Sequence, residues 1–339
     1  MNDLVKLAID AYKGNVTKYS VGEAQETLRQ ALIEANGGST KIDVRAIRDG
    51  KCNGVFALVE EIIKKTVEEG LVENPFFDTL VEYKNLADGD APLFDVYDDS
   101  LFYIDKVAKG TQGIRRQRLA GVSQVTIPVY VHAVRIYEEL ERIMAGRADF
   151  NEMIDKVSAS EKNAILTEVY DLFASISSAD LGTAYSIPNA GSAAGTYDES
   201  VLLTLIEHVE AAAGGKTATI YGTKAALRNL ANGITAPAEI AKEDMYNDGY
   251  IGKFYGANVV AIPQRHKIGT TNFVYNDKMI TIMASADKPI KVVREGDPLI
   301  IPRDPSLNMD LTQEYFMAEK WGTGIVMNGN SGIGKYVIA

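Results

Sequence analysis

Residues 109–118, KGTQGIRRQR, form a basic, glycine-containing stretch between two segments that are rich in strand-forming residues. The segment before it, 93–107, reads LFDVYDDSLFYIDKV, and the segment after it, 125–134, reads VTIPVYVHAV. β-Branched and aromatic residues are typical of strands, and polar residues with glycine between two such runs are typical of a turn. The pattern predicts a hairpin of roughly 45 residues, far longer than two ordinary strands of about 5–6 residues would give.

The basic stretch stands out because the chain as a whole is acidic. Its 339 residues carry a formal net charge of −11, yet Arg115, Arg116 and Arg118 lie together at the tip of the predicted hairpin. No aromatic residue lies among them to stack on a base, which disfavours a nucleic-acid site. We expect these three arginines to contact an acidic surface on another copy of the chain, because complementary charges guide such contacts.

A long amphipathic helix is predicted over residues 149–176. Its apolar residues recur at the three- and four-residue spacing of one helix face. They are Phe150, Met153, Ile154, Val157, Ala164, Ile165, Val169, Leu172, Phe173 and Ile176. At a rise of 1.5 Å per residue this helix is about 40 Å long, so we expect it to be the spine of a domain.

Shorter elements are predicted on both sides of this spine. Residues 1–36 and 54–69 show helical apolar spacing. After a glycine-bearing connector at 182–195, Thr196 and Glu199 form a capping box, which predicts a helix from Thr196 to Ala213. The remaining predicted elements are a strand at 217–221, a helix at 223–231, a strand at 259–262, a hairpin that joins 273–275 to 279–282, and short strands at 291–293 and 325–327.

Residue types that bind metals or carry catalysis are scattered along the chain. There is one cysteine, Cys52, and the three histidines, His132, His208 and His266, are each alone in their segments. A metal site needs several such ligands at suitable spacing. Paired carboxylates are numerous in an acidic chain and are typical of solvated faces. We therefore expect no catalytic residue and no metal.

Two stretches imitate a phosphate-binding loop. Residues 329–335, GNSGIGK, have the right spacing, but Tyr336 stands where a serine or threonine would bind Mg²⁺. Residues 215–217, GKT, have Glu210 in place of the first glycine, and they follow a predicted helix instead of preceding one. We interpret both as turns and expect no cofactor.

The N-terminus and the hydropathy of the chain bear on where the protein is made. Charged residues Asp3, Lys6 and Asp10 interrupt the first apolar stretch, so we expect no signal peptide. No run of 18 apolar residues occurs, so we expect no membrane span and no membrane partner.

The order of these parts resembles the major capsid proteins of tailed bacteriophages, whose fold is shared with encapsulins and the herpesvirus capsid floor. The likeness is carried by LADGDAP at 86–92 with DDSLF at 98–102, by GTQ at 110–112 with the three arginines, by IYEEL at 136–140, and by YIGKFYGANVV at 250–260. The resemblance extends over about residues 75–330.

This resemblance implies an α+β fold in four parts. They are an N-terminal arm with helices (1–87), an extended hairpin loop (88–134), a peripheral domain with the spine helix (135–194 and 310–339) and a mixed α/β axial domain (195–309). It also implies a structural, non-enzymatic subunit that assembles with itself into the pentamers and hexamers of an icosahedral head. The loop would overlap a neighbouring subunit.

The resemblance further implies a virion protein that is made in the host cytoplasm and has a portal, and a separate scaffold protein, as partners. It would enclose double-stranded DNA without sequence-specific binding, since an acidic chain gains nothing from contacts with phosphates. Two other functions stay open at this point. One is the shell of an encapsulin-like compartment that stores a protein, and the other is an α/β enzyme whose site the motifs do not show.

Overall fold

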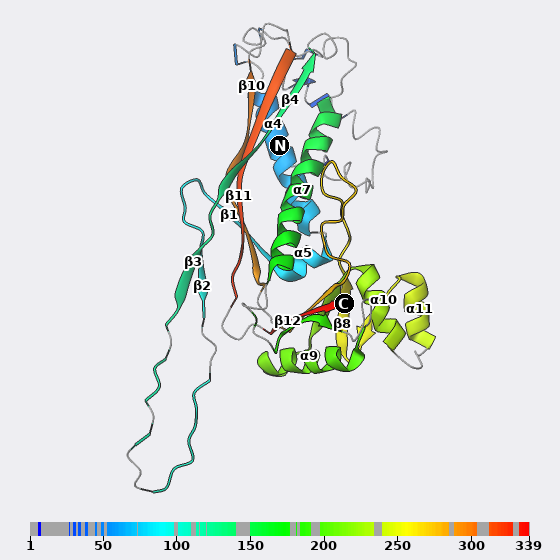
Figure 1. Ribbon diagram of the computed structural model, residues 1–339. Coiled ribbons are helices and arrows are strands. Elements are labelled where there is room, and N and C mark those ends of the chain that lie inside the picture. The colour runs from blue at the N-terminus through cyan, green and yellow to red at the C-terminus, as the bar shows by residue number, and fades with distance from the viewer. Residues whose placement is uncertain are drawn as a thin grey trace.

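The fold is taken from a computed structural model (Figure 1). It describes residues 53–72, 74–97, 101–109, 113–114, 116–119, 121–139, 150–176, 181, 184–190, 197–233, 239–284, 288–303, 312–327 and 332–338, with a few positions before residue 51. Most of the predicted helix over 1–36 lies outside these residues, as does Cys52. Figure 1 shows a body built on two sheets and a long arm that projects from it.

A four-stranded sheet with two long helices forms one half of the body. Its order is β1 (Val81–Leu86), β10 (Ile290–Arg303), β11 (Thr312–Ile325) and β4 (Tyr130–Glu139). β1 pairs with β10 in parallel, and the other two pairings are antiparallel. Helices α4 (Asn53–Val72) and α7 (Phe150–Ser175) lie on the same side of this sheet (Figure 1).

The two helices bury the faces that their sequences predict. Val59 and Ile63 of α4, and Leu166 and Val169 of α7, are almost completely buried in one core. The helix predicted over 149–176 is confirmed as α7. The helix predicted over 54–69 is confirmed as α4, which extends to Val72. α7 is therefore the spine that the apolar spacing indicated.

A short helix, α5 (Pro75–Leu80), connects α4 to β1. The side chain of Asn74 caps it by accepting the Phe76 N–H at 3.2 Å, and Pro75 takes the first helical position, where its missing N–H does no harm. The Phe76 ring packs edge-on against Tyr170 and Phe173 of the spine. This contact anchors the start of β1 on the C-terminal part of α7.

A six-stranded mixed sheet forms the other half of the body. Its order is β5 (Ser186–Ala190), β12 (Ile333–Ile338), β9 (Met279–Met283), β6 (Thr219–Gly222), β8 (Ala257–Ala261) and β7 (Lys253–Phe254). Helices α9 (Glu199–Ala212), α10 (Lys224–Gly233) and α11 (Glu239–Asn247) belong to this half (Figure 1). Leu205 and Val209 of α9 pack in one cluster with Ile280 and Tyr336. The strand–helix unit predicted at 217–231 is confirmed as β6 and α10.

The arm is a hairpin whose described strands pair at its root. β2 (Leu93–Val96) and β3 (Ser123–Thr126) are antiparallel, with Leu93 opposite Thr126. The predicted strands over 93–107 and 125–134 are therefore too long. The second run is divided at Pro128, which has no N–H to donate to a ladder, and β4 then leaves the arm to pair with β11.

The predicted hairpin that joins 273–275 to 279–282 is wrong. β9 lies between β12 and β6, and Phe273 instead forms a single bridge with His266. All five residues of β9 are buried. A strand that is buried on both faces takes partners from distant parts of the chain, which a local turn pattern does not indicate.

The helix predicted to begin at Thr196 begins at Glu199. Its N-cap is Asp198, whose carboxylate accepts the N–H groups of Ser200 and Val201 at 3.0 and 3.3 Å. The Asp198 backbone is itself held by the Tyr336 hydroxyl of β12, which accepts the Asp198 N–H at 2.8 Å. Aspartate caps a helix as well as threonine does, and here the tertiary contact selects it.

Each of the two sheets combines segments from different parts of the division that the resemblance implied. Residues 290–303, which that division assigns to the axial part, form β10 beside β1 and β11. Residues 333–338, which it assigns to the peripheral part, form β12 in the six-stranded sheet. The short strands predicted at 291–293 and 325–327 belong to β10 and to the end of β11, each 14 residues long.

Candidate assembly interface

The arm leaves the four-stranded sheet at a turn that is held by charged side chains. After β1, Gly89 donates its N–H to Glu295 Oε1 at 2.9 Å. Lys320 Nζ lies 2.7 Å from Asp88 Oδ1, and this hydrogen bond raises the pKa of Lys320. Because Glu295 is on β10 and Lys320 is on β11, the contacts fix the direction in which the arm starts.

The root of the arm is a small apolar cluster. Phe94 and Ile127 from the arm are buried against Val293 of β10 and against Val326, which follows β11. Lys84 Nζ lies 4.2 Å from the centroid of the Phe94 ring, a distance typical of a cation–π contact. The root is therefore packed as part of the body.

The returning limb of the arm crosses β11 at two glycines. Gly322 lies against Pro128, and Gly324 lies against the side chain of Ile127. The sequence analysis missed both glycines, although a signal was present. In the stretch WGTG at 321–324 they alternate along a strand, so they share one face and leave it open to a second layer of chain.

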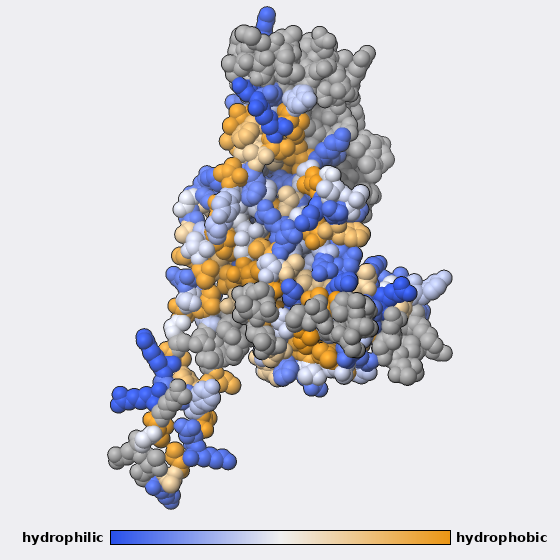
Figure 2. Space-filling view, viewed as in Figure 1, coloured by the Kyte–Doolittle hydropathy of each residue, from blue (hydrophilic) through white to orange (hydrophobic). Residues whose placement is uncertain are grey.

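Beyond its root, the arm exposes large apolar side chains. Leu101, Ile104 and Leu119 are 90%, 95% and 77% exposed. Figure 2 shows apolar and hydrophilic residues interleaved along the arm, away from the body. Soluble proteins rarely leave contiguous apolar surface uncovered unless it binds something. The resemblance implied that the loop overlaps a neighbouring subunit, and these side chains offer apolar surface for such a contact.

One side chain joins the two limbs of the arm in its distal part. Gln117 Oε1 accepts the Tyr103 N–H at 2.8 Å, and Gln117 Nε2 donates to the Tyr103 carbonyl at 2.7 Å. The Gln117 amide thus satisfies both the backbone N–H and the backbone carbonyl of Tyr103, as a paired strand would do. From sequence, Gln117 stood out only as part of the stretch that resembles the far side of the loop, and its bond to the opposite limb was not predicted.

Two of the three arginines, Arg116 and Arg118, lie on the returning limb on either side of Gln117. Arg116 and Arg118 are exposed, and Arg115 lies outside the described residues. No ion pair to either Arg116 or Arg118 is found within the described part of the chain. Positive charge is therefore presented to solvent by the arm of an acidic subunit.

The face of the four-stranded sheet that points away from the helices also carries exposed apolar residues. They include Val131 of β4, Ile301 of β10 and Phe316 of β11. A shallow groove crosses this face, lined by Ala133, Val134, Arg135, Ile301, Pro302, Arg303, Glu314 and Phe316. Glu314 pairs with both Arg135 and Arg303, so these three residues leave a net positive charge in the groove.

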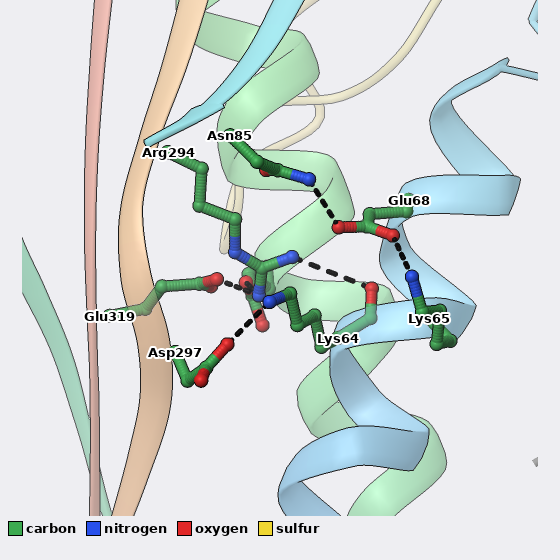
Figure 3. Close-up of polar contacts among 8 residues, drawn as sticks. Lys64, Lys65, Glu68, Asn85, Arg294, Asp297 and Glu319 are labelled. Atoms are coloured by element: carbon green, nitrogen blue, oxygen red, sulfur yellow. Dashed lines mark hydrogen bonds and ion pairs between the residues drawn. The ribbon is translucent and has the colours of Figure 1, made fainter. Parts of the chain in front are cut away.

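A buried guanidinium ties the spine to the sheet behind this face. Arg294 of β10 is 2% exposed; it pairs with Glu319 of β11, and it lies 3.4 Å from Glu161 of α7. It also donates to the Lys64 carbonyl of α4 at 3.4 Å. Figure 3 shows Arg294 reaching from the sheet toward α4, beside the Lys64–Asp297 pair. The cluster holds two helices and two strands together.

His132 and Lys335 have structural roles. His132 stacks on Trp321, with ring centroids 3.6 Å apart, and lies 3.3 Å from Glu168 of the spine. Lys335 Nζ donates to the Ala174 and Ile176 carbonyls at 2.9 and 3.0 Å, where it caps the C-terminal end of α7. Burial lowers the pKa of this amine.

The described residues bear on metal binding and on membrane insertion. Within them, no group of three or more histidine, cysteine, aspartate or glutamate side chains is placed to hold a metal ion. None of the helices in the described parts is both long enough and apolar enough to cross a bilayer.

Comparison with known proteins gives one family and one fold. A family model described as "SPbeta prophage-derived putative capsid protein YonB" matches residues 1–334. No curated protein matches the chain in sequence. The capsid structure of cyanophage P-SCSP1u is similar with a TM-score of 0.50 and 11% identity, over 78% of this chain and 88% of that one. A chain of Mycobacterium phage Patience gives a TM-score of 0.47 and 15% identity, over 84% and 89%.

The cyanophage likeness shows the fold, which is that of a phage major capsid protein. The α+β class and the phage major capsid fold that the resemblance implied are thus confirmed.

Proposed function

Because the chain belongs to the YonB family of prophage-derived capsid proteins, we propose that it forms the head shell of a tailed phage by assembling with copies of itself into pentamers and hexamers. The family and the fold point to a structural role, without enzymatic activity. The membership also favours a genome container over a protein-storing compartment, because the family is prophage-derived.

The observation that carries this proposal is the exposed arm. Its apolar residues, with Leu101 and Ile104 almost fully exposed, are buried only if another molecule covers them. Every subunit of a shell has the same arm and the same body. Burial of one subunit's arm on the next subunit's body is a head-to-tail contact, and such contacts close into rings when the rotation between copies allows it.

The two sheets suggest how the chain is divided within such a shell. We assign the four-stranded sheet with α4 and α7 to a peripheral part and the six-stranded sheet with α9, α10 and α11 to an axial part. The extended loop is then the stretch from Leu93 to Thr126, since β4 belongs to the peripheral sheet. This division replaces the boundaries at 134, 195 and 310 with ones set by strand pairing.

The charge of the subunit indicates how it relates to DNA. A net charge of −11 repels phosphates, so the shell encloses double-stranded DNA without sequence-specific contacts. A portal for DNA entry and a separate scaffold protein are its expected partners. The subunit is made in the host cytoplasm and ends in the virion, as the proposal requires.

The test is assembly of the full chain, followed by sedimentation and electron microscopy over a range of salt and protein concentrations. We expect closed shells or capsomer-like rings. As a control, residues 98–121 are replaced by a short glycine–serine turn that leaves β2 paired with β3. This variant keeps its circular dichroism spectrum but sediments slowly. A full chain that remains a small oligomer in every condition contradicts the proposal.

A further inference from the structure

Among the described strands, none pairs with the outer edge of β4. β4 is the last strand of its sheet, and β11 is its only partner among the described strands. It is ten residues long, and Val131 and Val134 are 63% and 41% exposed. An edge strand that is long, apolar and exposed presents a row of backbone donors and acceptors to another strand. Soluble proteins usually cover such an edge.

The limb of the arm at 101–107 is the complementary element. It reads LFYIDKV, which is rich in strand-forming residues, and Figure 1 shows it as an extended trace outside any sheet. The two hydrogen bonds between Gln117 and Tyr103 occupy one edge of this limb. In an extended chain the backbone groups of Phe102 and Ile104 point to the opposite edge.

We propose that residues 101–107 of a second copy add to β4 as a fifth strand of the four-stranded sheet, with Gln117 holding the limb in the conformation that β4 receives. This inference rests on the proposed function and names the contact by which one subunit engages the next. Strand addition obtains its affinity from main-chain hydrogen bonds and its register from side chains on alternate positions.

The side chains select one register. In a parallel alignment that places Leu101 beside Val131, Ile104 lies beside Val134 and Asp105 lies beside Arg135. Two apolar pairs and one pair of opposite charge thus fall on one offset. Asp105 also supplies a carboxylate to the groove in which Arg135 and Arg303 share Glu314.

The orientation of the side chains agrees with this register. Arg135 pairs with Phe316 in the sheet and points to the face that carries the groove, whereas His132 points to the spine and contacts Glu168. Because side chains alternate along a strand, Asp105 lies on the groove face and Ile104 on the spine face, beside Val134. An exposed side chain is covered on each face.

A disulfide across the proposed pair tests the register. In a Cys52→Ala background, which has no other cysteine, Val134→Cys is combined with Ile104→Cys. Neighbouring strands bring such residues within the 4.4–6.8 Å between Cα atoms that a disulfide spans, about one strand spacing. After assembly and mild oxidation, we expect ladders of linked copies and loss of the single-subunit band on a non-reducing gel.

Two matched variants control for random collision. Val134→Cys with Leu101→Cys is three residues out of register, and Val134→Cys with Ile114→Cys uses the other limb; both should keep the single-subunit band. Shells that form without links in the Ile104 variant, or with equal links in all three, overturn this inference and leave the proposed function intact. Failure of the unmodified chain to form shells overturns the proposed function instead.

A second measurement uses the unmodified chain, in case the cysteine variants do not fold. Hydrogen exchange is followed at the amides of Phe102 and Ile104 in free subunits and in shells. Strand addition slows exchange at both amides on assembly, because their N–H groups become donors to β4. Unchanged exchange at both amides in intact shells overturns the inference.

Discussion

The backbone of Pro128 passes so close to Gly322 that a Cβ at Gly322 would lie 2.3 Å from the Pro128 carbonyl oxygen. At Gly324 the nearest contact would be an Ile127 side-chain atom at 3.1 Å. Backbone atoms cannot rotate away as side-chain atoms can. The requirement for glycine is therefore stricter at position 322 than at position 324. The returning limb of the arm is thus seated on β11 only because position 322 has no side chain.

Gly322→Ala should therefore destabilise the subunit by about 1–3 kcal/mol, the range for overpacking at a closely packed site. The limb must shift away from β11, which also opens the cluster of Phe94 and Ile127. Urea unfolding gives the change in the free energy of unfolding. Gly113→Ala is the control, because a Cβ at this position in the arm meets nothing within 4 Å. Equal stability of the two variants would contradict the argument.

Arg294→Met should be the most damaging single change in the body. It leaves the carboxylates of Glu161 and Glu319 buried without their cation, and breaking a buried ion pair in this way costs about 3–5 kcal/mol. In chemical denaturation at neutral pH, the variant should therefore unfold at a far lower denaturant concentration than the wild type.

Lys64→Met is the control for this charge cluster. Its partner Asp297 is 79% exposed, so the loss of that pair should change stability by less than about 1 kcal/mol. Adding Glu161→Leu and Glu319→Leu to Arg294→Met should recover stability, because no charge then remains buried. A triple variant as unstable as Arg294→Met alone argues that the packing, and not the charge, is at fault.

The Glu82–Lys291 pair should make the stability of the subunit depend on pH. Burial raises the pKa of the Glu82 carboxyl, but the hydrogen bonds and charges of Lys291 and Lys84 lower it further than burial raises it. A carboxyl whose pKa is lower in the folded state stabilises the fold above its unfolded pKa, and this contribution is lost as the pH falls through the folded pKa.

Lys291→Met removes the main cause of this lowering. The stability difference between wild type and variant should be largest at neutral pH and should shrink below the ordinary glutamate pKa of about 4.3. Urea unfolding midpoints, measured for both proteins from neutral pH to below about pH 4.3, show how this stability difference changes with pH. In a Glu82→Gln background the effect of Lys291→Met on stability should not change with pH. A pH dependence that persists in this background would assign the effect to another group.

The sequence predicted the parts that depend on local pattern. The spine helix followed from apolar spacing at positions such as Ile165 and Val169, and the arm followed from a basic turn between two strand-like runs. The placement of Arg116 and Arg118 on an exposed arm also agrees with the expectation from sequence. Their contact with a neighbour stays a prediction, since it lies outside a single subunit.

The long strands β10 and β11 were not predictable in this way. The stretch REGDP at 294–298 looks like a polar turn, but Arg294 is buried with its carboxylate partners, and the residues after it form a bulge in the pairing with β11. Glu319 and Gly322 interrupt the apolar pattern of β11 in the same manner, although the strand itself is continuous from Thr312 to Ile325. Buried charges and close backbone approaches are tertiary features, so an apolar pattern along the sequence misses them.

The arginine tip gives the last prediction. Replacing Arg115, Arg116 and Arg118 together by glutamate should abolish shell formation and leave the subunit folded. One rim ion pair contributes little, often below about 1 kcal/mol, but the same contact recurs at every subunit of a closed shell. Charge reversal also adds repulsion from an acidic neighbour, which exceeds the loss of attraction alone. The fold should persist because Arg116 and Arg118 are exposed.

The charge and the shape of the tip are separated by a second triple variant, in which lysine replaces the same three arginines. It keeps the positive charge, so shells should form, whereas the glutamate variant should yield slow-sedimenting species with native-like circular dichroism. Salt provides an independent check, because the screening length falls from about 8 Å at 0.15 M to about 3 Å at 1 M. Added salt should narrow the difference between the two variants. Intact shells from the glutamate variant would refute the contact, and an unfolded subunit would show that the tip supports the fold instead.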